Sequence, residues 1–427
     1  MGFELKEGFL LGVASAATQI EGGECGSNWN DWYHKGRIKD NSNPARATDH
    51  YNLWQQDADL MADMKIQNYR LGIEWARICP KEKEVDEAVI AHYREELSYL
   101  QSKGISVLLT IHHFTNPMWF EQKGGFEKKE NLKCFLDFVA LVVNSFGDIV
   151  SEYITINEPN VYATISYFFG DWPPGEKSFG KTITVMSNMA IAHIKAYQLI
   201  HKMRQEKGFH NSRVSFANHV RVFEPANKKN PWHLVCSRLS ERFFQDAITV
   251  AMCTGVFQWP LHKEEGIFQG EYCDFIAVNY YTRTSVSGLA DGTKQGAPKN
   301  DLGWEIYPEG IVRCSEKLYQ ILKRPIYITE NGTCDNHDTF RCKYIHEHLK
   351  AVTESELPFE RYYHWCFCDN FEWIEGESSR FGLVHTNYET QERTIKNSGE
   401  FYIKIIEEGA VTDEIYDQYV KAQEYHF

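Results

Sequence analysis

Short apolar runs alternate with longer helical stretches along the whole chain. The runs cover 9–17, 68–75, 106–113, 152–158, 213–219, 273–281, 325–330 and 362–370. Apolar residues recur at helical spacing in the stretches 50–64, 86–102, 131–146, 181–206, 232–250, 308–323, 338–352 and 398–408. Eight strand–helix alternations predict an α/β fold, a parallel sheet closed into a single (β/α)8 TIM barrel over residues 1–427. No linker or low-complexity tract divides the sequence.

Polar residues gather at or just after the carboxyl ends of these runs. The set includes Gln19, Arg70, His112, His113, Asn157, Glu158, Asn218, His219, Asn279, Tyr281, Glu330, Glu372 and Trp373. In a barrel these ends form one face, and that face carries the active site. We therefore expect the side chains to meet in one mouth, although a polar strand cap is the commoner explanation for His112, Asn218 or His219 taken singly.

Two glutamates stand out within this set. Glu158 lies in Thr-Ile-Asn-Glu-Pro at 155–159, and Glu330 lies in Ile-Thr-Glu-Asn-Gly at 328–332. Hydrolysis of a sugar acetal needs one protonated carboxyl to protonate the leaving oxygen and one ionised carboxylate to attack or to activate water. Either glutamate alone would be an ordinary strand end, but the pair indicates this chemistry.

The residues expected around the two glutamates bear on the charge of Glu330 and on the direction in which Glu158 points. Arg70 is a natural counter-charge for an ionised Glu330, and Tyr281 is a plausible hydroxyl donor to it, although Arg70 could equally be a bridge within the barrel. Asn157 precedes Glu158, so both can face the mouth only if the strand tip is bulged, and Pro159 would fix that irregular end.

The chain has a large aromatic supply for this face. We expect it to include Trp119, Trp172, Trp259, Trp304, Trp365, Trp373 and Phe381. Aromatic rings stack on pyranose faces, but such a set is more often core than ligand platform. Trp365 and Trp373 nevertheless flank a polar interruption of the eighth run at 369–372, which a core alone would not require.

Composition narrows the partners. A formal charge of -14 disfavours nucleic acid or an anionic membrane. The apolar stretch 9–17 follows Glu4 and Glu7 rather than a basic segment, and no run reaches the roughly 18 residues of a membrane span. Eleven cysteines suit a reducing, cytoplasmic setting, and Cys366 and Cys368 lack the second pair of a zinc site, so we expect neither metal nor cofactor.

The chain closely resembles the family 1 glycoside hydrolases, the β-glucosidase family. The resemblance spans nearly the whole length and includes 19–22 (QIEG), 110–117 (TIHHFTNP), the two glutamate motifs, 303–310 (GWEIYPEG) and 369–373 with 380–383. It implies that Glu158 is the acid/base and Glu330 the nucleophile of a retaining mechanism. It further implies glycone contacts from Gln19, His113, Asn157, Glu372 and Trp373, with Trp365 beneath the sugar, support from Asn279, Tyr281 and Arg70, and an aglycone platform at Trp304, with Phe381 in the same substrate site.

Three positions depart from the commoner family pattern. Phe114 follows His113 where Trp is usual, which removes an indole donor near the glycone. The segment 71–74 (LGIE) replaces a strand that usually contains Phe and Ser, and 375–379 (EGESS) replaces a more aromatic loop. The catalytic pair is unaffected.

The resulting expectation is a retaining exo-β-glycosidase, foremost a β-glucosidase, acting on unphosphorylated small-molecule β-glycosides. A 6-phospho-β-glycosidase is the runner-up, but Glu372 would repel a phosphate, and Glu375 and Glu377 add acid without a lysine. A non-catalytic sugar-binding relative would be expected to have lost one carboxylate. Glucose, galactose or fucose as glycone, and an assembly of identical copies, are all compatible with the sequence.

Overall fold

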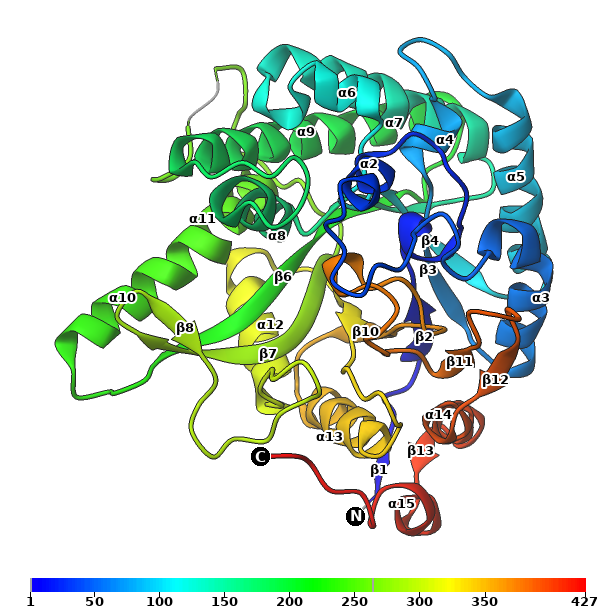
Figure 1. Cartoon of the computed structure of the whole chain (residues 1–427), viewed down its shortest axis with the longest axis vertical. Coiled ribbons are helices and arrows are strands. Elements are labelled where there is room, and N and C mark those ends of the chain that lie inside the picture. Colours follow the sequence, from blue (N-terminus) through cyan, green and yellow to red (C-terminus); the bar gives the residue numbers. More distant parts are fainter. Residues whose placement is uncertain (1, 263–264) are drawn as a thin grey trace.

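The protein is a closed (β/α)8 barrel, seen in the computed structural model, which describes residues 2–262 and 265–427 (Figure 1). All eight expected strands are present. They are β2 (Leu10–Ala14), β3 (Asn68–Gly72), β4 (Ser106–His112), β5 (Glu152–Asn157), β6 (Arg213–Pro225), β7 (Ile276–Ser287), β9 (Ile326–Asn331) and β10 (Phe359–Trp365). Each pairs in parallel with its neighbours, and the β10–β2 and β6–β7 pairings close the barrel.

Helices cover the outside of the barrel. The expected ones are α3 (His50–Asp63), α5 (Glu87–Ser102), α7 (Leu132–Phe146), α9 (Phe179–Glu206), α10 (Pro231–Glu241), α11 (Ala247–Thr254), α12 (Glu309–Ile321), α13 (Arg341–Glu354) and α14 (Asn397–Glu408). Because the strands have helices on one side and the barrel interior on the other, they are buried on both faces, which explains why their sequences are near-continuous apolar runs.

Shorter elements connect these layers. They are α1 (Ala17–Ile20), α2 (Asn28–His34), α4 (Trp75–Ile78), α6 (Met118–Gln122), α8 (Pro159–Ala163), α15 (Asp413–Tyr419), the 3-10 turns η1 (Gly125–Glu127), η2 (Lys129–Asn131) and η5 (Trp373–Glu375), and strands β8 (Ala290–Gly292), β11 (Val384–Thr386) and β12 (Arg393–Ile395). An antiparallel pair, β1 (Phe3–Glu4) with β13 (Ala410–Val411), brings the two ends of the chain together (Figure 1).

Several expected boundaries were wrong, most of all at β6, β7 and β10. The run expected over 362–370 is β10, which covers Phe359–Trp365. β6 continues beyond residue 219 to Pro225, and β7 begins at Ile276 rather than 273 and continues to Ser287. The two strands stay paired past the barrel, where β8 joins β7, and this ribbon projects from the barrel beside α10 (Figure 1). The single helix expected over 232–250 is interrupted by a π-helical segment, η4 (Arg242–Asp246). A second π segment, η3 (Thr164–Phe169), follows α8.

Among the described residues, none of the helices combines the length and the apolar character needed to cross a bilayer. All eleven cysteines are free thiols, and nine of them are buried.

Candidate active site

Glu158 lies at the junction of β5 and α8. Its backbone adopts a left-handed conformation, with φ at 44°, and Pro159 begins the helix. The register of β5 against β6 shifts between Ile154 and Asn157, which is the irregular strand tip that the sequence required. As a result, Asn157 and Glu158 face the same neighbour, because the amide of Asn279 donates to Asn157 Oδ1 at 2.9 Å and to Glu158 Oε1 at 2.8 Å.

Glu330 is held by two strong donors. Arg70 on β3 forms a buried salt bridge with Glu330 Oε1, and the hydroxyl of Tyr281 donates to Oε2 at 2.6 Å. Both carboxylate oxygens are therefore satisfied. Since a guanidinium and a phenol stabilise the ionised form of a carboxyl, this environment favours the Glu330 anion.

The two glutamates differ in the groups that oppose the effect of burial on their pKa values. Burial raises the pKa of Glu158 to about 7, and its nearest opposing influence is a neutral amide from Asn279. Burial also raises the pKa of Glu330 to about 7, with Arg70 opposing that rise and the nearby Glu158 adding to it. A single proton shared by the pair therefore resides on Glu158, because only Glu330 has a guanidinium in direct contact.

Asn157 links the two glutamates to the rest of the site. Its Oδ1 accepts from Arg70 at 2.6 Å, and its Nδ2 lies 2.9 Å from His113 Nε2. Burial lowers the pKa of His113 well below its usual value, so the ring is neutral. Because the amide donates to Nε2, the ring proton lies on Nδ1, which has no partner among the described residues. The Nδ1–H of His113 is therefore buried without a partner, while its Nε2 accepts from Asn157.

A third carboxyl lies close to this pair. Glu372 accepts from Gln19 Nε2 at 3.2 Å, and desolvation raises the pKa of Glu372 to about 8, with Trp365 as a hydrogen-bond donor opposing that rise. Gln19 is fully buried and also donates to Asn370 and to the carbonyl of Phe371, while its Oε1 lacks a partner in the described part of the chain. The carboxyl of Glu372, which Gln19 holds in place, is an acceptor suited to sugar hydroxyls.

Comparison with known proteins decides the family. The model of glycosyl hydrolase family 1 matches residues 2–410. The chain belongs to glycosyl hydrolase family 1. It is 29% identical to beta-glucosidase A of Thermotoga maritima, over 95% of this chain and 98% of that enzyme.

Solved structures agree with this family 1 assignment. A beta-glycosidase from Pyrococcus horikoshii superposes with a TM-score of 0.88 at 31% identity, over 99% of this chain and 100% of the other. The beta-glucosidase from Thermotoga maritima in complex with glucoimidazole gives a TM-score of 0.87 at 28% identity, over 95% and 99% of the two chains. The family 1 enzyme described here is thus an O-glycoside hydrolase of the β-glucosidase type, as its sequence predicted.

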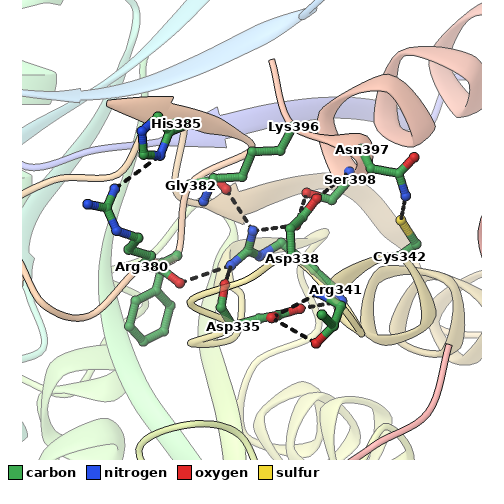
Figure 2. A network of polar contacts seen from close by, with 12 residues as sticks. Asp335, Asp338, Arg341, Cys342, Arg380, Gly382, His385, Lys396, Asn397 and Ser398 are labelled. Atoms are coloured by element: carbon green, nitrogen blue, oxygen red, sulfur yellow. Dashed lines mark hydrogen bonds and ion pairs between the residues drawn. The ribbon is translucent and has the colours of Figure 1, made fainter. Parts of the chain in front are cut away.

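A buried ionic network fixes the segment that carries Glu372, Trp373 and Phe381. Figure 2 shows Arg341, which donates to Asp338 at 2.6 Å and to the carbonyls of Asp335, Arg380 and Gly382 at 2.7 to 2.9 Å. The carbonyls of Arg380 and Gly382 flank Phe381, so α13 is tied directly to the loop that forms one wall of the site.

The other end of the same segment begins at Asp369. Lys396 donates to Asp369 at 2.7 Å and Arg380 donates at 3.0 Å. Burial alone would raise the pKa of Asp369. Lys396 and the other nearby cations outweigh burial and hold this pKa well below its usual value. Asp369 therefore stays ionised and anchors the loop at neutral pH.

A cavity of about 1040 Å³ lies over Glu158 and Glu330. Of the expected substrate-binding residues, His113, Tyr281, Trp304, Trp365, Glu372, Trp373 and Phe381 line it together with Glu158 and Glu330. Asn157, Asn279, Arg70 and Gln19 lie behind that lining and hold the residues that form it. Trp172 lines the cavity as well, and it packs against Phe114 at 4.9 Å.

Two of the expected aromatic residues lie elsewhere. Trp119 donates its indole N–H to the carbonyl of Cys79 and packs edge-on against Trp75, and Trp259 is on the surface, so neither lines the cavity. Their positions in the sequence gave no sign of this, because a tryptophan in a connecting loop can turn toward the mouth or toward the outer helices.

The cavity also contains His219, which the sequence placed at a strand end, and Arg221, which the sequence did not single out. His219 Nδ1 lies 3.5 Å from Glu158 Oε1, and its ring stacks on Tyr281 at 5.6 Å. Arg221 lines the wall two residues later on β6. Continuing the alternation of the fifth run beyond 219 would have placed Arg221 on the same side as His219. Five phenylalanines of the outer wall, described below, carried no such signal.

Proposed function

We propose that this family 1 enzyme is a retaining exo-β-glycosidase, a β-glucosidase that removes terminal unphosphorylated β-linked sugars by double displacement. The observation that carries the proposal is the contrast between Glu158, paired with the amide of Asn279, and Glu330, paired with Arg70 and Tyr281. Glu330 attacks the anomeric carbon, while Glu158 first protonates the leaving oxygen and then activates water.

The glycone is held at the deep end of the cavity. His113 and the carboxyl of Glu372 line this end and bind its hydroxyls, and Trp365 and Trp373 pack on its apolar faces. A glucose-like glycone is supported by the relative from Thermotoga maritima, which has been solved with glucoimidazole. The eleven free cysteines suit a reducing compartment such as the cytoplasm.

Two substitutions test the roles of the carboxyls. Glu330→Ala should abolish turnover of every glycoside, and added azide should restore activity with an inverted product, because azide occupies the vacated nucleophile position. Glu158→Ala should retain activity on aryl glucosides with good leaving groups and lose it on alkyl glucosides, because only poor leaving groups need the proton. Glu130→Ala, at an exposed position of η2, is the control and should match the native enzyme. Identical leaving-group dependence in both catalytic variants would contradict the assignment.

The loop after Glu372 supports a preference for unphosphorylated sugars. Asp40 accepts from the backbone amides of Glu377 at 2.7 Å and Ser378 at 3.0 Å. Phosphate binding needs cations or free amides, and the carboxylate of Asp40 already accepts hydrogen bonds from these two backbone amides. Burial, followed by the charge of Asp40, also raises the pKa of Glu377 to about 7. We expect kcat/KM for an aryl β-glucoside to exceed that for its 6-phospho form at least about tenfold, or ~1.4 kcal/mol; the opposite preference would refute this proposal.

A further inference from the structure

Aromatic residues build the outer wall of the catalytic cavity. Phe168 and Phe169 come from η3, Phe179 begins α9, and Phe243 and Phe244 come from η4. The ring centroids of Phe179 and Phe243 lie 5.3 Å apart in a stacked arrangement, and those of Phe168 and Phe243 lie 5.9 Å apart. The two π segments therefore place their phenylalanines in contact across the mouth. Such segments occur frequently at functional sites.

These rings are exposed in a way that the rest of the core is not. Phe168 is 39% exposed, Phe169 is 53% exposed and Phe179 is 51% exposed, whereas Phe135 on α7 has no exposed surface. Clustered apolar exposure of this kind marks a binding groove or an interaction surface rather than ordinary surface composition.

The apolar surface continues outward along α10. Trp232, Val235 and Leu239 are exposed and follow each other at spacings of three and four, so they lie on one side of the helix. Leu239 and the fully solvent-facing Leu289, in the turn between β7 and β8, both line the cavity. The stripe is thus continuous with the catalytic cavity rather than separate from it.

Two charged groups of this wall, Lys39 and Arg221, are engaged by neighbours, and the exposed Asp171 also lines it. Lys39 pairs with Glu375 at 2.5 Å. The guanidinium of Arg221 lies 4.7 Å from the ring centroid of Phe244. Asp291 is the carboxylate that most strongly favours the charged form of Arg221. The outer half of the cavity is consequently apolar along most of its length, in contrast to the hydrogen-bonding groups beside the catalytic pair.

The volume of the cavity indicates that a large leaving group binds beside the sugar. Its volume of about 1040 Å³ lies at the upper end of the roughly 300–1,000 Å³ that enclose a drug-sized ligand. We propose that the outer half binds a long apolar chain of the leaving group, so that the preferred substrates are amphiphilic β-glycosides with an alkyl or lipid aglycone. This inference rests on the proposed function, because it takes the deep end of the cavity to be the sugar site.

A chain-length series tests the proposal with monomeric substrates. We expect kcat/KM for alkyl β-glucosides, kept below their critical micelle concentrations, to rise about threefold per methylene between butyl and octyl, since each added methylene becomes buried. The same dependence should appear in the affinity of hydrolysis-resistant alkyl β-thioglucosides measured by calorimetry. Octyl should bind about 80-fold more tightly than butyl.

Variants locate the effect. Phe243→Ser and Phe169→Ser should flatten the chain-length dependence while leaving kcat/KM for methyl β-glucoside within about twofold, because neither side chain reaches the sugar. Phe268→Ser is the matched control, since Phe268 is 76% exposed but lies outside the cavity, and it should keep the native slope.

Each outcome separates the inference from the function on which it rests. Turnover of methyl and octyl glucosides with equal efficiency, together with equal thioglucoside affinities, would overturn the inference and leave the glycosidase intact. Chain-dependent binding without hydrolysis of any glycoside would overturn the proposed function instead. Binding of the enzyme to phosphatidylcholine vesicles, with no chain-length dependence for monomeric substrates, would show that the apolar wall is a membrane-docking surface and would refute the proposal.

Discussion

Removing the hydroxyl of Tyr281 should raise the pKa of Glu330. Tyr281→Phe deletes only the donor that lies 2.6 Å from Glu330 Oε2 and leaves the ring that stacks on His219. Burial raises the pKa of the Tyr281 phenol well above its usual value, so the hydroxyl is protonated and donates at every working pH. The salt bridge from Arg70 remains in the variant.

The size of the shift follows from the charge on the acceptor. A hydrogen bond to an ionised group contributes about 1.5–3 kcal/mol, and one pKa unit corresponds to about 1.36 kcal/mol. Loss of the bond destabilises the anion, so the pKa of Glu330, which burial raises to about 7 in the native enzyme, should rise by about 1 to 2 units. At about pH 6 kcat/KM should then fall by about 10- to 100-fold, and the loss should disappear in alkali.

The assay is the pH dependence of kcat/KM for a dinitrophenyl β-glucoside. This leaving group departs without a proton, so the profile reports the ionisation of the nucleophile and not that of Glu158. Tyr280→Phe is the matched control on the same strand. The hydroxyl of Tyr280 donates to the carbonyl of Tyr307 at 2.6 Å and does not contact the catalytic pair, so its loss should reduce stability by about 1 kcal/mol without moving the profile.

An acidic limb that stays in place in Tyr281→Phe would refute the reasoning. So would an equal shift in Tyr280→Phe, because the effect would then be a general response of β7 rather than of the bond to Glu330.

Three further predictions concern stability and recognition. His50 donates to Asp57 at 2.7 Å and to Glu96 at 2.9 Å. Burial lowers the pKa of His50, but the two carboxylates outweigh burial and raise that pKa to about 10. The stability that charged His50 contributes is therefore complete below about pH 6.5 and is lost as the pH rises toward 10. Calorimetry of His50→Gln should show a loss of about 3–5 kcal/mol near pH 6 that shrinks in alkali, and a constant difference would contradict this. Arg341→Met should lower the free energy of unfolding by a similar ~3–5 kcal/mol, because Asp338 loses its ion-pair partner. The variant should also have a higher KM, because the loop of Glu372 is held less firmly. A lowered Tm with an unchanged KM would show that the network does not position the site. Glu372→Gln should narrow the preference for unphosphorylated glucosides mainly by lowering their kcat/KM, which parallel assays on both substrates would measure, and an unchanged ratio would exclude Glu372 as the discriminating group.

The sequence predicted the barrel because each strand is buried on both faces. Runs such as 106–113 and 325–330 are too short and too uniformly apolar for surface helices, and the connecting stretches have helical periodicity. The same logic predicted that Glu158 and Glu330 share one cavity, since polar residues at strand ends have only one face to share. The contacts of Glu330 with Arg70 and Tyr281 were predicted for the same reason.

The outer wall could not be predicted by that reasoning. Phe168, Phe179 and Phe243 lie in helical segments where an apolar residue normally points to the core, and only the π segments and the projecting β6–β7 ribbon bring them to the rim. The ends of those two strands were missed because pairing beyond the barrel depends on the partner strand and not on either sequence alone. The network around Arg341 was equally hidden, since backbone carbonyls form most of it.

The anomeric configuration of the first product tests the central claim most directly. Proton NMR recorded in the first minutes of aryl β-glucoside hydrolysis by the native enzyme separates the α and β anomers of released sugar before they interconvert. If Glu330 forms a covalent glycosyl-enzyme that Glu158 then helps water to open, the β anomer appears first. Initial release of the α anomer would mean a single displacement by water and would contradict the roles assigned to both glutamates.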